Sequence, residues 1–395
     1  MPCERENANC FMTEGQTPEL PADGPLAGMR LAVKDLFNVK GFPTGAGNPD
    51  FLRLAAPAER NAAAVDLLLG AGAEFAGKTV TDEFAYSISG RNAHYGAPLN
   101  GAASERLPGG SSSGSASAVS CGLAEIGLGT DTGGSTRCPA SSCGLFGIRP
   151  THGRGPLSGC LPLAPSFDTC GLLARDIGTL RAASNALYGE DKGTGPERPR
   201  IIFPEDALEA LGEQAVETLR CSALLLRSFF GGSESGRLAL VPLAVTAEAF
   251  RRLQAAEAWG SFGEFITRER PSLGPGVKER FEFAREAAGM DLAEPRRVRS
   301  GLIRHLDGLL GDDGVMVLPT LSGPSPSRDA EEEEIGRFRT RNLLTLSAGS
   351  LSGLPWVSLP LGESDGAPVG LSMVGPRGRD EWLLSLAEAF VENCF

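Results

Sequence analysis

The stretch PGGSSSGSASAVSCGLAEIGLGTDTGGSTRCPASSCGLFGIRP, residues 108–150, organises this sequence. It holds two glycine pairs that each precede a serine, Gly109-Gly110-Ser111 and Gly133-Gly134-Ser135. Between them, an Ala/Ser-rich run is typical of a helix, and the apolar run 123–128 is typical of a strand. A flexible linker does not alternate with apolar segments in this way, so the pattern indicates two tight turns tied to one folded unit.

The second glycine pair belongs to the row Thr132-Gly133-Gly134-Ser135, which follows the apolar run and precedes Pro139, where a helix can begin. Glycine reaches backbone conformations closed to other residues and lets main-chain N–H groups approach a ligand closely. Several N–H groups of such a turn can point at one spot. This is what an oxyanion hole requires.

A serine hydroxyl is a weak nucleophile and needs a base. Upstream, Lys34 lies in the short apolar run 31–37, which is typical of a strand, with Asp35 on the opposite face. A lysine on a strand usually extends its ammonium to water. In apolar surroundings its pKa falls instead, and the neutral amine becomes available as a general base. From these residues alone, Lys34 can be either a solvated surface residue or a buried general base.

With these residues in hand, the sequence resembles the amidase signature family of serine hydrolases. The shared segments are AVKDLFNVKGFPTGAGNPDFL (32–52), GAEFAGKTVTDEFAYS (72–87), the whole of 108–150, LPLAPSFDTCGLLARDI (161–177) and a weaker C-terminal part that includes VMVLPT (315–320). Only about residues 190–312 look unrelated. The segment before Lys34 is short. This shortness, together with the segment 82–96, makes the sequence most similar to the short plant-type indole-3-acetamide hydrolases of this family.

The resemblance implies a catalytic triad in which Ser135 is the nucleophile, Ser111 is a bridging serine preceded by a cis peptide bond, and Lys34 is the terminal base. It also implies an oxyanion hole formed by the N–H groups of Thr132, Gly133, Gly134 and Ser135. In the family, the loop after the EFA segment lines the acyl site, which points to Tyr86 and Ser87. The family's chemistry needs no metal and no organic cofactor.

The fold that the resemblance implies is α/β, with a central mixed, twisted sheet flanked by helices on both faces. We expect residues 1–24 to form a loose N-terminal arm and residues 25–395 to form a single amidase domain. Within this domain the signature core covers about 70–180 and a variable helical region covers about 190–312. In that region, 211–230 is typical of one amphipathic helix.

The implied activity is hydrolysis of a carboxamide C–N bond through an acyl-enzyme, with an arylacetamide such as indole-3-acetamide as the best concrete substrate. One alternative from the same resemblance is the glutaminase subunit of a tRNA-dependent amidotransferase, which works only with partner subunits. A catalytically silent binding protein is a third possibility, but the intact triad gives no reason to prefer it.

The formal net charge of −12 argues against nucleic acid or an anionic membrane as the main partner and favours a small amide substrate that is neutral or cationic. The composition leaves a homodimer open. Nine cysteines are scattered without CxxC spacing, so neither a disulfide framework nor a zinc site is expected. With no signal-peptide core and no apolar run of about 20 residues, a cytoplasmic location fits best.

Two other motifs point to different chemistry. Residues 72–79 satisfy the phosphate-binding pattern GxxxxGK[ST], but the motif itself reads as a strand that follows a helix, the reverse of a P-loop. Gly110–Gly114 fits the GxSxG elbow of α/β-hydrolases, with Ser112 as nucleophile and Asp168 and His305 in the matching order. The residues before Gly110 are loop-like, which counts against an elbow. An esterase using Ser112 therefore remains a weaker alternative.

The remaining candidates have ordinary structural explanations. Cys138 and Cys143 are close to Ser135 in sequence but have no histidine at a recognisable spacing, so a catalytic cysteine is not expected. Phe167 and Trp356 are aromatic candidates for the pocket that fit a plain core equally well. Asp131 and Arg137 flank the nucleophile and fit a supporting polar shell. The glutamate run 331–334 is typical of a solvated loop or helix start.

Overall fold

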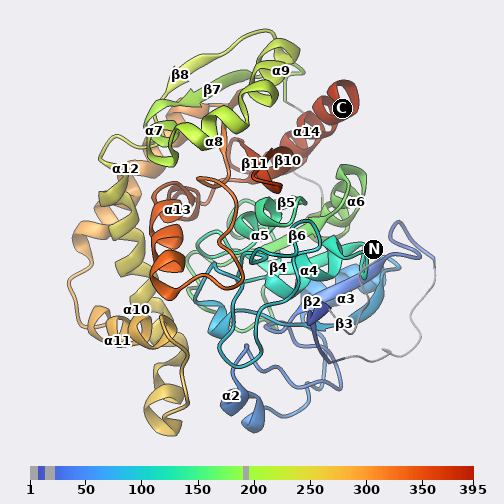
Figure 1. Ribbon diagram of the computed structural model, residues 1–395, viewed down its shortest axis with the longest axis vertical. Coiled ribbons are helices and arrows are strands. Elements are labelled where there is room, and N and C mark those ends of the chain that lie inside the picture. Colours follow the sequence, from blue (N-terminus) through green and yellow to red (C-terminus); the bar gives the residue numbers. More distant parts are fainter. Residues whose placement is uncertain (1–7, 14–22, 190–194) are drawn as a thin grey trace.

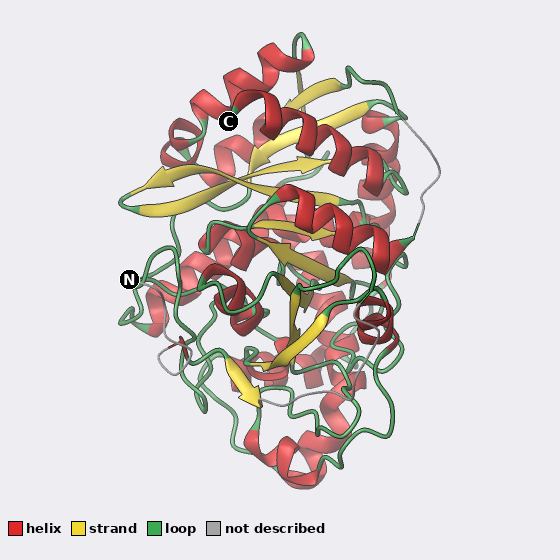
Figure 2. Cartoon of the chain, turned by 90° about the vertical axis from the view of Figure 1, so that its right-hand side faces the viewer, coloured by secondary structure: helices red, strands yellow, loops and turns green. Residues whose placement is uncertain are grey.

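The structure is a computed structural model that describes residues 8–13, 23–189 and 195–395. Its strands form one sheet in the order β1-β3-β2-β4-β6-β5-β10-β11-β9-β7-β8, which Figures 1 and 2 show from two sides. The strands are β1 Phe11–Thr13, β2 Arg30–Lys34, β3 Glu74–Thr79, β4 Ile126–Thr130, β5 Phe146–Arg149, β6 Cys170–Ala174, β7 Arg200–Pro204, β8 Glu234–Gly236, β9 Gly314–Pro319, β10 Trp356–Ser364 and β11 Ala367–Val374. Parallel and antiparallel pairs both occur, so the predicted mixed α/β sheet is confirmed.

Helices cover both faces of this sheet (Figure 2). They are α2 Pro49–Leu54, α3 Ala63–Gly70, the 3-10 segment η1 Glu83–Ala85, α4 Ser113–Ser120, α5 Arg137–Ser142, α6 Ile177–Tyr188, α7 Glu205–Leu211, α8 Glu213–Thr218, α9 Arg220–Phe230, α10 Leu243–Glu269, α11 Val277–Ala287, α12 Ala293–Leu310, α13 Glu332–Ser352 and α14 Asp380–Cys394. In the part of the chain that the structure describes, none of these helices combines the length and the apolar character needed to cross a bilayer.

Each face of the sheet has its own apolar core, because successive side chains of a strand point to opposite faces of the sheet. In β9, Val315 and Val317 join the core beneath α3, α6 and α14, whereas Met316 and Leu318 join the core beneath α10, α12 and α13. The helices α10–α13 lie together on the left of Figure 1, and α6 and α14 lie on its right. Apolar strand residues therefore hold helices in place on both sides.

The stretch 108–150 occupies the middle of the sheet. Strands β2 and β4 are parallel neighbours, with Val33 opposite Leu128. Because the carboxyl ends of parallel strands meet at the same edge of a sheet, Lys34 at the end of β2 and Thr130 at the end of β4 are brought side by side. Both serine turns open at this edge, one before α4 and one before α5.

Two sequence expectations need correction. Within the arm predicted at residues 1–24, residues 11–13 form β1, which pairs with β3, while 1–7 and 14–22 lie outside the described residues. The single helix expected at 211–230 is two helices, α8 and α9, with Leu219 between them at φ −103° and ψ 6°. The side chain of Leu219 is buried in the core, a tertiary contact that local periodicity does not encode.

Candidate active site

Lys34 is fully buried at the end of β2 and contacts three hydroxyls. Its Nζ lies 2.7 Å from Ser111 Oγ, 2.7 Å from Thr130 Oγ1 and 3.1 Å from Ser112 Oγ. Burial disfavours the charged ammonium and lowers the pKa of Lys34 to about 8, although the nearby Asp82 carboxylate acts in the opposite direction. The alternative in which Lys34 extends to water is therefore wrong.

Ser111 and Ser112 lie in the turn that leads into α4, and the Gly110–Ser111 peptide bond is cis, as the resemblance implied. The backbone N–H of Ser112 donates to the carbonyl of Ser135 at 3.2 Å and so ties the two serine turns together. Ser112 Oγ also donates to the Thr130 carbonyl at 3.2 Å. Gly129 permits this contact, because a Cβ atom there would lie 2.5 Å from Ser112 Oγ.

Ser135 lies in the turn between β4 and α5, next to Gly134, whose φ of 117° favours glycine. Ser135 is only 2% exposed to solvent. Among the described residues, no hydrogen bond joins the Ser135 hydroxyl to Ser111 or to any other group. The structure thus brings the two turns together and leaves the Ser135 hydroxyl without a hydrogen-bond partner among the described residues.

The four N–H groups expected to form an oxyanion hole are not equivalent. Gly134 N–H donates to Asp131 Oδ1 at 2.9 Å, so it is already used within the protein. The N–H groups of Thr132, Gly133 and Ser135 are buried, and none donates a hydrogen bond within the described ranges. Buried N–H groups without a partner are rare in folded proteins. This turn therefore offers three donors, not four, to an oxygen atom of a ligand.

Asp131 holds the turn that carries Ser135 in place. Its carboxylate accepts from Arg137 Nη2 and from Arg149 Nη1, each at 2.9 Å, and from the N–H groups of Gly134 and Thr136. Burial alone would raise the pKa of Asp131, but the two guanidinium groups outweigh burial and hold the pKa far below its usual range. The supporting role expected for Asp131 and Arg137 agrees with these contacts. Arg149, in β5, has no sequence signal and was missed.

Replacing Asp131 by alanine is expected to lower the free energy of unfolding by about 3–5 kcal/mol, because it leaves two buried arginines without their counterion. Denaturant unfolding followed by circular dichroism measures this loss. The matched control is Glu333→Ala, which removes a carboxylate that is 84% exposed and paired with Arg337 on the surface of α13. That change should cost about 1 kcal/mol or less. Equal losses in both variants would contradict the role given to Asp131.

Asp82 is a further buried group that sequence analysis missed. It is fully buried against the first serine turn, where a Cβ on Gly110 would lie 2.4 Å from Asp82 Oδ2. Its Oδ2 accepts from the Gly90 N–H at 3.0 Å, and its Oδ1 has no hydrogen-bond partner among the described residues. Burial raises the pKa of Asp82, and its charge raises that of Lys34. Asp82 therefore adjusts the basicity of Lys34 without contacting it through a hydrogen bond.

The three residues of the alternative elbow site contact different partners. Ser112 Oγ is bound to Thr130, Asp168 Oδ1 accepts from Thr132 Oγ1 at 2.6 Å, and His305 Nε2 lies 2.8 Å from the Arg237 carbonyl. The serine, the aspartate and the histidine thus make no Ser-His-Asp chain. The structure does not support an esterase site at Ser112.

The other motifs are structural. In the pattern at 72–79, Lys78 is buried in β3 and forms an ion pair with Asp35 at 2.7 Å, so it is not presented by a loop to a phosphate. Cys138 is fully buried, and burial raises the pKa of its thiol to about 12. Burial also raises the pKa of the Cys143 thiol. Both thiols therefore stay protonated near neutral pH and lack the thiolate that a nucleophile needs.

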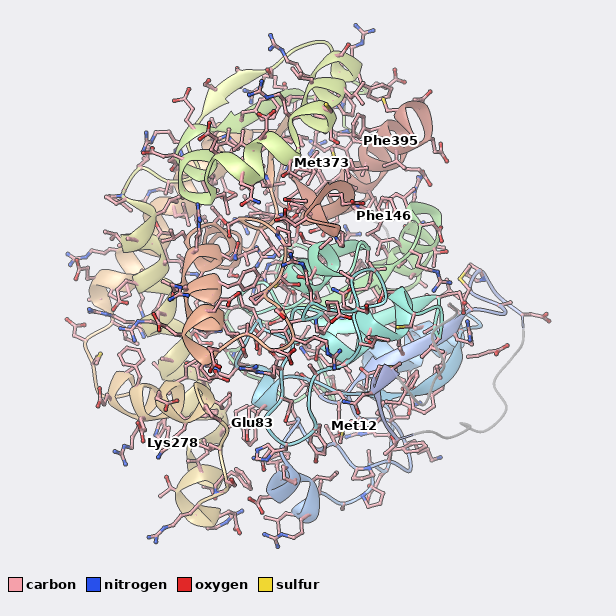
Figure 3. All side chains as sticks on the ribbon, in the orientation of Figure 1. Met12, Glu83, Phe146, Lys278, Met373 and Phe395 are labelled. Carbon is pink, nitrogen blue, oxygen red and sulfur yellow. The ribbon has the colours of Figure 1, made fainter. Side chains whose placement is uncertain are left out.

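Two neighbouring cavities are lined by residues within and just after η1. One of about 530 Å³ is lined by Tyr86 and Gln254, and a neighbouring one of about 490 Å³ is lined by Ser87 and Glu83. Glu83, labelled in Figure 3, accepts from the Gly274 N–H at 2.9 Å and so ties η1 to the segment before α11. Both residues expected at the acyl site, Tyr86 and Ser87, therefore line cavities.

The two other aromatic candidates for the pocket, Phe167 and Trp356, are fully buried core residues. Phe167 packs edge-on against Phe250, and Trp356 lies under Arg137. Phe167 supports the turn of Ser135 through Phe250, because a Cβ on Gly133 would meet the Phe250 ring at 3.0 Å, whereas Trp356 supports Arg137. The glutamate run is confirmed as a solvated helix start, at the beginning of α13.

Comparison with known proteins gives a consistent result. A family model described as Amidase matches residues 12–222, more than half of the chain. The chain is 38% identical to "Amidase 1" of Arabidopsis thaliana over 92% of both proteins, and 29% identical to a glutamyl-tRNA(Gln) amidotransferase subunit of Methanospirillum hungatei over 98% of this chain and 97% of that protein. A solved structure titled "Crystal structure of amidase" superposes with a TM-score of 0.81 at 33% identity, covering 94% of this chain and 85% of that one.

Proposed function

The chain belongs to the Amidase family and is a hydrolase of amide C–N bonds, and we propose that it cleaves a small carboxamide through Ser135, Ser111 and Lys34. The observation that carries this proposal is the contact between the buried Lys34 amine and the Ser111 hydroxyl at 2.7 Å. A lysine whose pKa is lowered by burial is a base that can work near neutral pH.

In the proposed reaction, neutral Lys34 accepts the proton of Ser111 Oγ. Ser111 in turn accepts the proton of Ser135 Oγ as that oxygen attacks the amide carbonyl carbon. The C–N bond then breaks, and the proton returns through Ser111 to the leaving nitrogen, which departs as ammonia or an amine. Water attacks the acyl-enzyme by the same relay and releases the carboxylic acid and free Ser135.

The surroundings of Lys34 support this direction of proton transfer. A protonated lysine has three donors, which match the hydroxyls of Ser111, Ser112 and Thr130. The neutral amine keeps two donors and gains a lone pair. If the two N–H donors of the neutral Lys34 amine stay on the hydroxyls of Ser112 and Thr130, its lone pair faces the hydroxyl of Ser111. The remaining link, from Ser111 to Ser135, is expected to tighten when substrate binds, as catalytic hydrogen bonds often do.

The negative charge of the tetrahedral intermediate is assigned to the turn after β4. The N–H groups of Thr132, Gly133 and Ser135 are buried and make no hydrogen bond within the described part of the chain, so they can donate to the developing oxyanion without first breaking another bond. Gly134 N–H is instead expected to hold the turn on Asp131 throughout the reaction.

The pH dependence of turnover follows from the pKa of Lys34. Because the amine must be neutral to accept a proton and its pKa is about 8, kcat/KM is expected to rise with pH and to reach half its maximum near pH 8. In Asp82→Asn the midpoint should move to lower pH, because the Asp82 charge raises the pKa of Lys34. Rates of ammonia release between pH 5 and pH 10 measure both profiles. A midpoint below pH 7 that is unchanged by the Asp82 substitution would contradict Lys34 as the base.

The activity is tested by ammonia release from a panel of primary carboxamides, with Ser135→Ala as the blank. The panel includes indole-3-acetamide, the arylacetamide that the sequence suggested. It also includes glutamine, because the similarity to the amidotransferase relative covers almost the whole chain. Release from small amides by the isolated chain supports the proposal. Release from glutamine alone, and only in the presence of a partner chain, would favour a glutaminase subunit instead.

A further inference from the structure

A buried ion pair lies next to the proposed base, on the opposite face of the sheet. Asp35 follows Lys34 at the end of β2, and Lys78 lies in the neighbouring strand β3. Lys78 Nζ lies 2.7 Å from Asp35 Oδ1, and both side chains are buried. Lys78 is paired with Val33 in the sheet, so it shares the face of Val33, whereas Lys34 points to the other face. Neither member of the ion pair has a role in the proposed reaction.

The pair fastens the loop 43–46 to the end of β2. The other two donors of the Lys78 ammonium go to the Pro43 carbonyl and to Thr44 Oγ1, each at 2.7 Å. Asp35 Oδ2 accepts from the Gly45 N–H at 2.9 Å. All three donors of the ammonium are therefore used within the protein, and none is left for a ligand.

The backbone on the C-terminal side of Lys34 is fixed by the same aspartate. The chain turns sharply there, because the Lys34 carbonyl accepts from the N–H groups of the second and third residues after it, at 2.7 and 3.0 Å. Within this turn, the Asp35 N–H donates to the Thr79 carbonyl and the Asp35 carbonyl accepts from the Ala46 N–H, each at 3.1 Å. The main chain and the side chain of Asp35 thus both hold the point from which the Lys34 side chain starts.

Stability alone does not explain an ion pair at this position. Removing two charges from water costs about as much free energy as their attraction returns, and a well-packed apolar pair of similar size is often at least as stable. What such a pair does provide is geometry, because charge-assisted hydrogen bonds are short and directional. Here they hold a turn next to Lys34, whose amine must stay on the Ser111 hydroxyl. Displacing a catalytic group by about 1 Å can lower turnover by about 100-fold.

We propose that Asp35 and Lys78 are positioning residues that hold the Lys34 amine on the Ser111 hydroxyl. The pair contacts neither the substrate nor the reacting atoms and acts through the backbone of Lys34. This proposal rests on the proposed function, in which Lys34 is the base, and adds two residues on which that base depends.

The segment η1, which leads to the residues expected at the acyl site, is anchored separately from the pair. Glu83, labelled in Figure 3, accepts from Asn48 Nδ2 at 2.6 Å and from the Gly274 N–H at 2.9 Å. The Phe84 N–H donates to the Ala46 carbonyl, a backbone contact that involves neither charged side chain. Loss of the pair should therefore lower kcat with little change in KM.

The test compares Asp35→Asn and Lys78→Met with the double variant that carries both changes. Each single change leaves a buried charge without its partner and should lower the thermal midpoint, whereas the double variant has no unpaired charge and should regain much of it. In all three, kcat for the amide that the wild-type chain hydrolyses fastest should fall about tenfold or more, with KM changed less than about threefold. The double variant replaces any single variant that does not fold.

The matched control is Asp380→Asn, which removes a buried carboxylate that pairs with Arg154 at the start of α14. It should lower the thermal midpoint and keep kcat. Crystal structures of the same variants give a result independent of turnover. The distance from Lys34 Nζ to Ser111 Oγ, 2.7 Å in the intact chain, should exceed about 3.5 Å when the pair is lost.

The distance and the rate decide different questions. If Lys34 stays within hydrogen-bond distance of Ser111 in the double variant, the positioning role is overturned. An equal fall of kcat in Asp380→Asn also overturns it, because kcat would then follow stability and not position. If the distance lengthens while kcat keeps its wild-type value, or while the wild-type chain hydrolyses no amide, the positioning role stands and Lys34 as the base fails.

Discussion

Replacement of Ser135 by alanine is expected to lower kcat/KM for amide hydrolysis by about 10⁴-fold or more, because it removes the atom proposed to attack the carbonyl carbon. The thermal midpoint should hardly change, since the Ser135 hydroxyl makes no hydrogen bond with the described residues. Ammonia release and thermal unfolding of the same preparations measure the two effects.

The matched control is Ser104→Ala, which removes a hydroxyl in an exposed loop. This variant should retain full turnover. If Ser135→Ala kept more than about a tenth of wild-type kcat/KM, Ser135 would not be the nucleophile, because loss of a nucleophile is expected to cost far more than that.

Replacement of Lys34 by methionine is the second change with a large expected effect. Methionine has a similar length and no charge, so it can occupy the buried position while removing the amine that receives the proton of Ser111. We expect kcat/KM to fall by about 10³-fold or more. Binding of the substrate, measured in the Ser135→Ala background, should persist, since Lys34 lines neither of the two cavities that Tyr86 and Ser87 line.

The double variant Lys34→Met/Ser135→Ala provides a stricter test of the same step. Residues that act as one relay have effects that do not add, so the double variant is expected to be no slower than Ser135→Ala alone. Lys278→Met, at an exposed position of α11, should leave turnover unchanged. Additive losses in the double variant would mean that Lys34 and Ser135 act in separate steps.

The centre of this site could be predicted because its parts are local in sequence. Each serine follows its own glycine pair, and Lys34 ends an apolar strand. The sequence pattern left open whether Lys34 is exposed to water or buried, and the fold shows that it is buried. The parallel pairing of β2 with β4 places its amine beside Thr130 and Ser111. Resemblance to a family suggested the catalytic roles proposed for these residues, and the tertiary structure shows the contacts between them.

The parts that could not be predicted depend on contacts between distant residues. Nothing near Asp131 in the sequence indicates that Arg149 shares its carboxylate, or that Gly134 N–H is used there. Burial without a partner is visible only in three dimensions.

The most direct test of the proposed mechanism needs no knowledge of the substrate. A fluorophosphonate probe, which transfers its phosphonyl group to an activated serine and releases fluoride, is incubated with the wild-type chain and with Lys34→Met. Digestion and mass spectrometry then locate the adduct. The proposed relay predicts modification of Ser135 in the wild type and its loss in Lys34→Met. Modification of Ser112 that does not depend on Lys34 would contradict it.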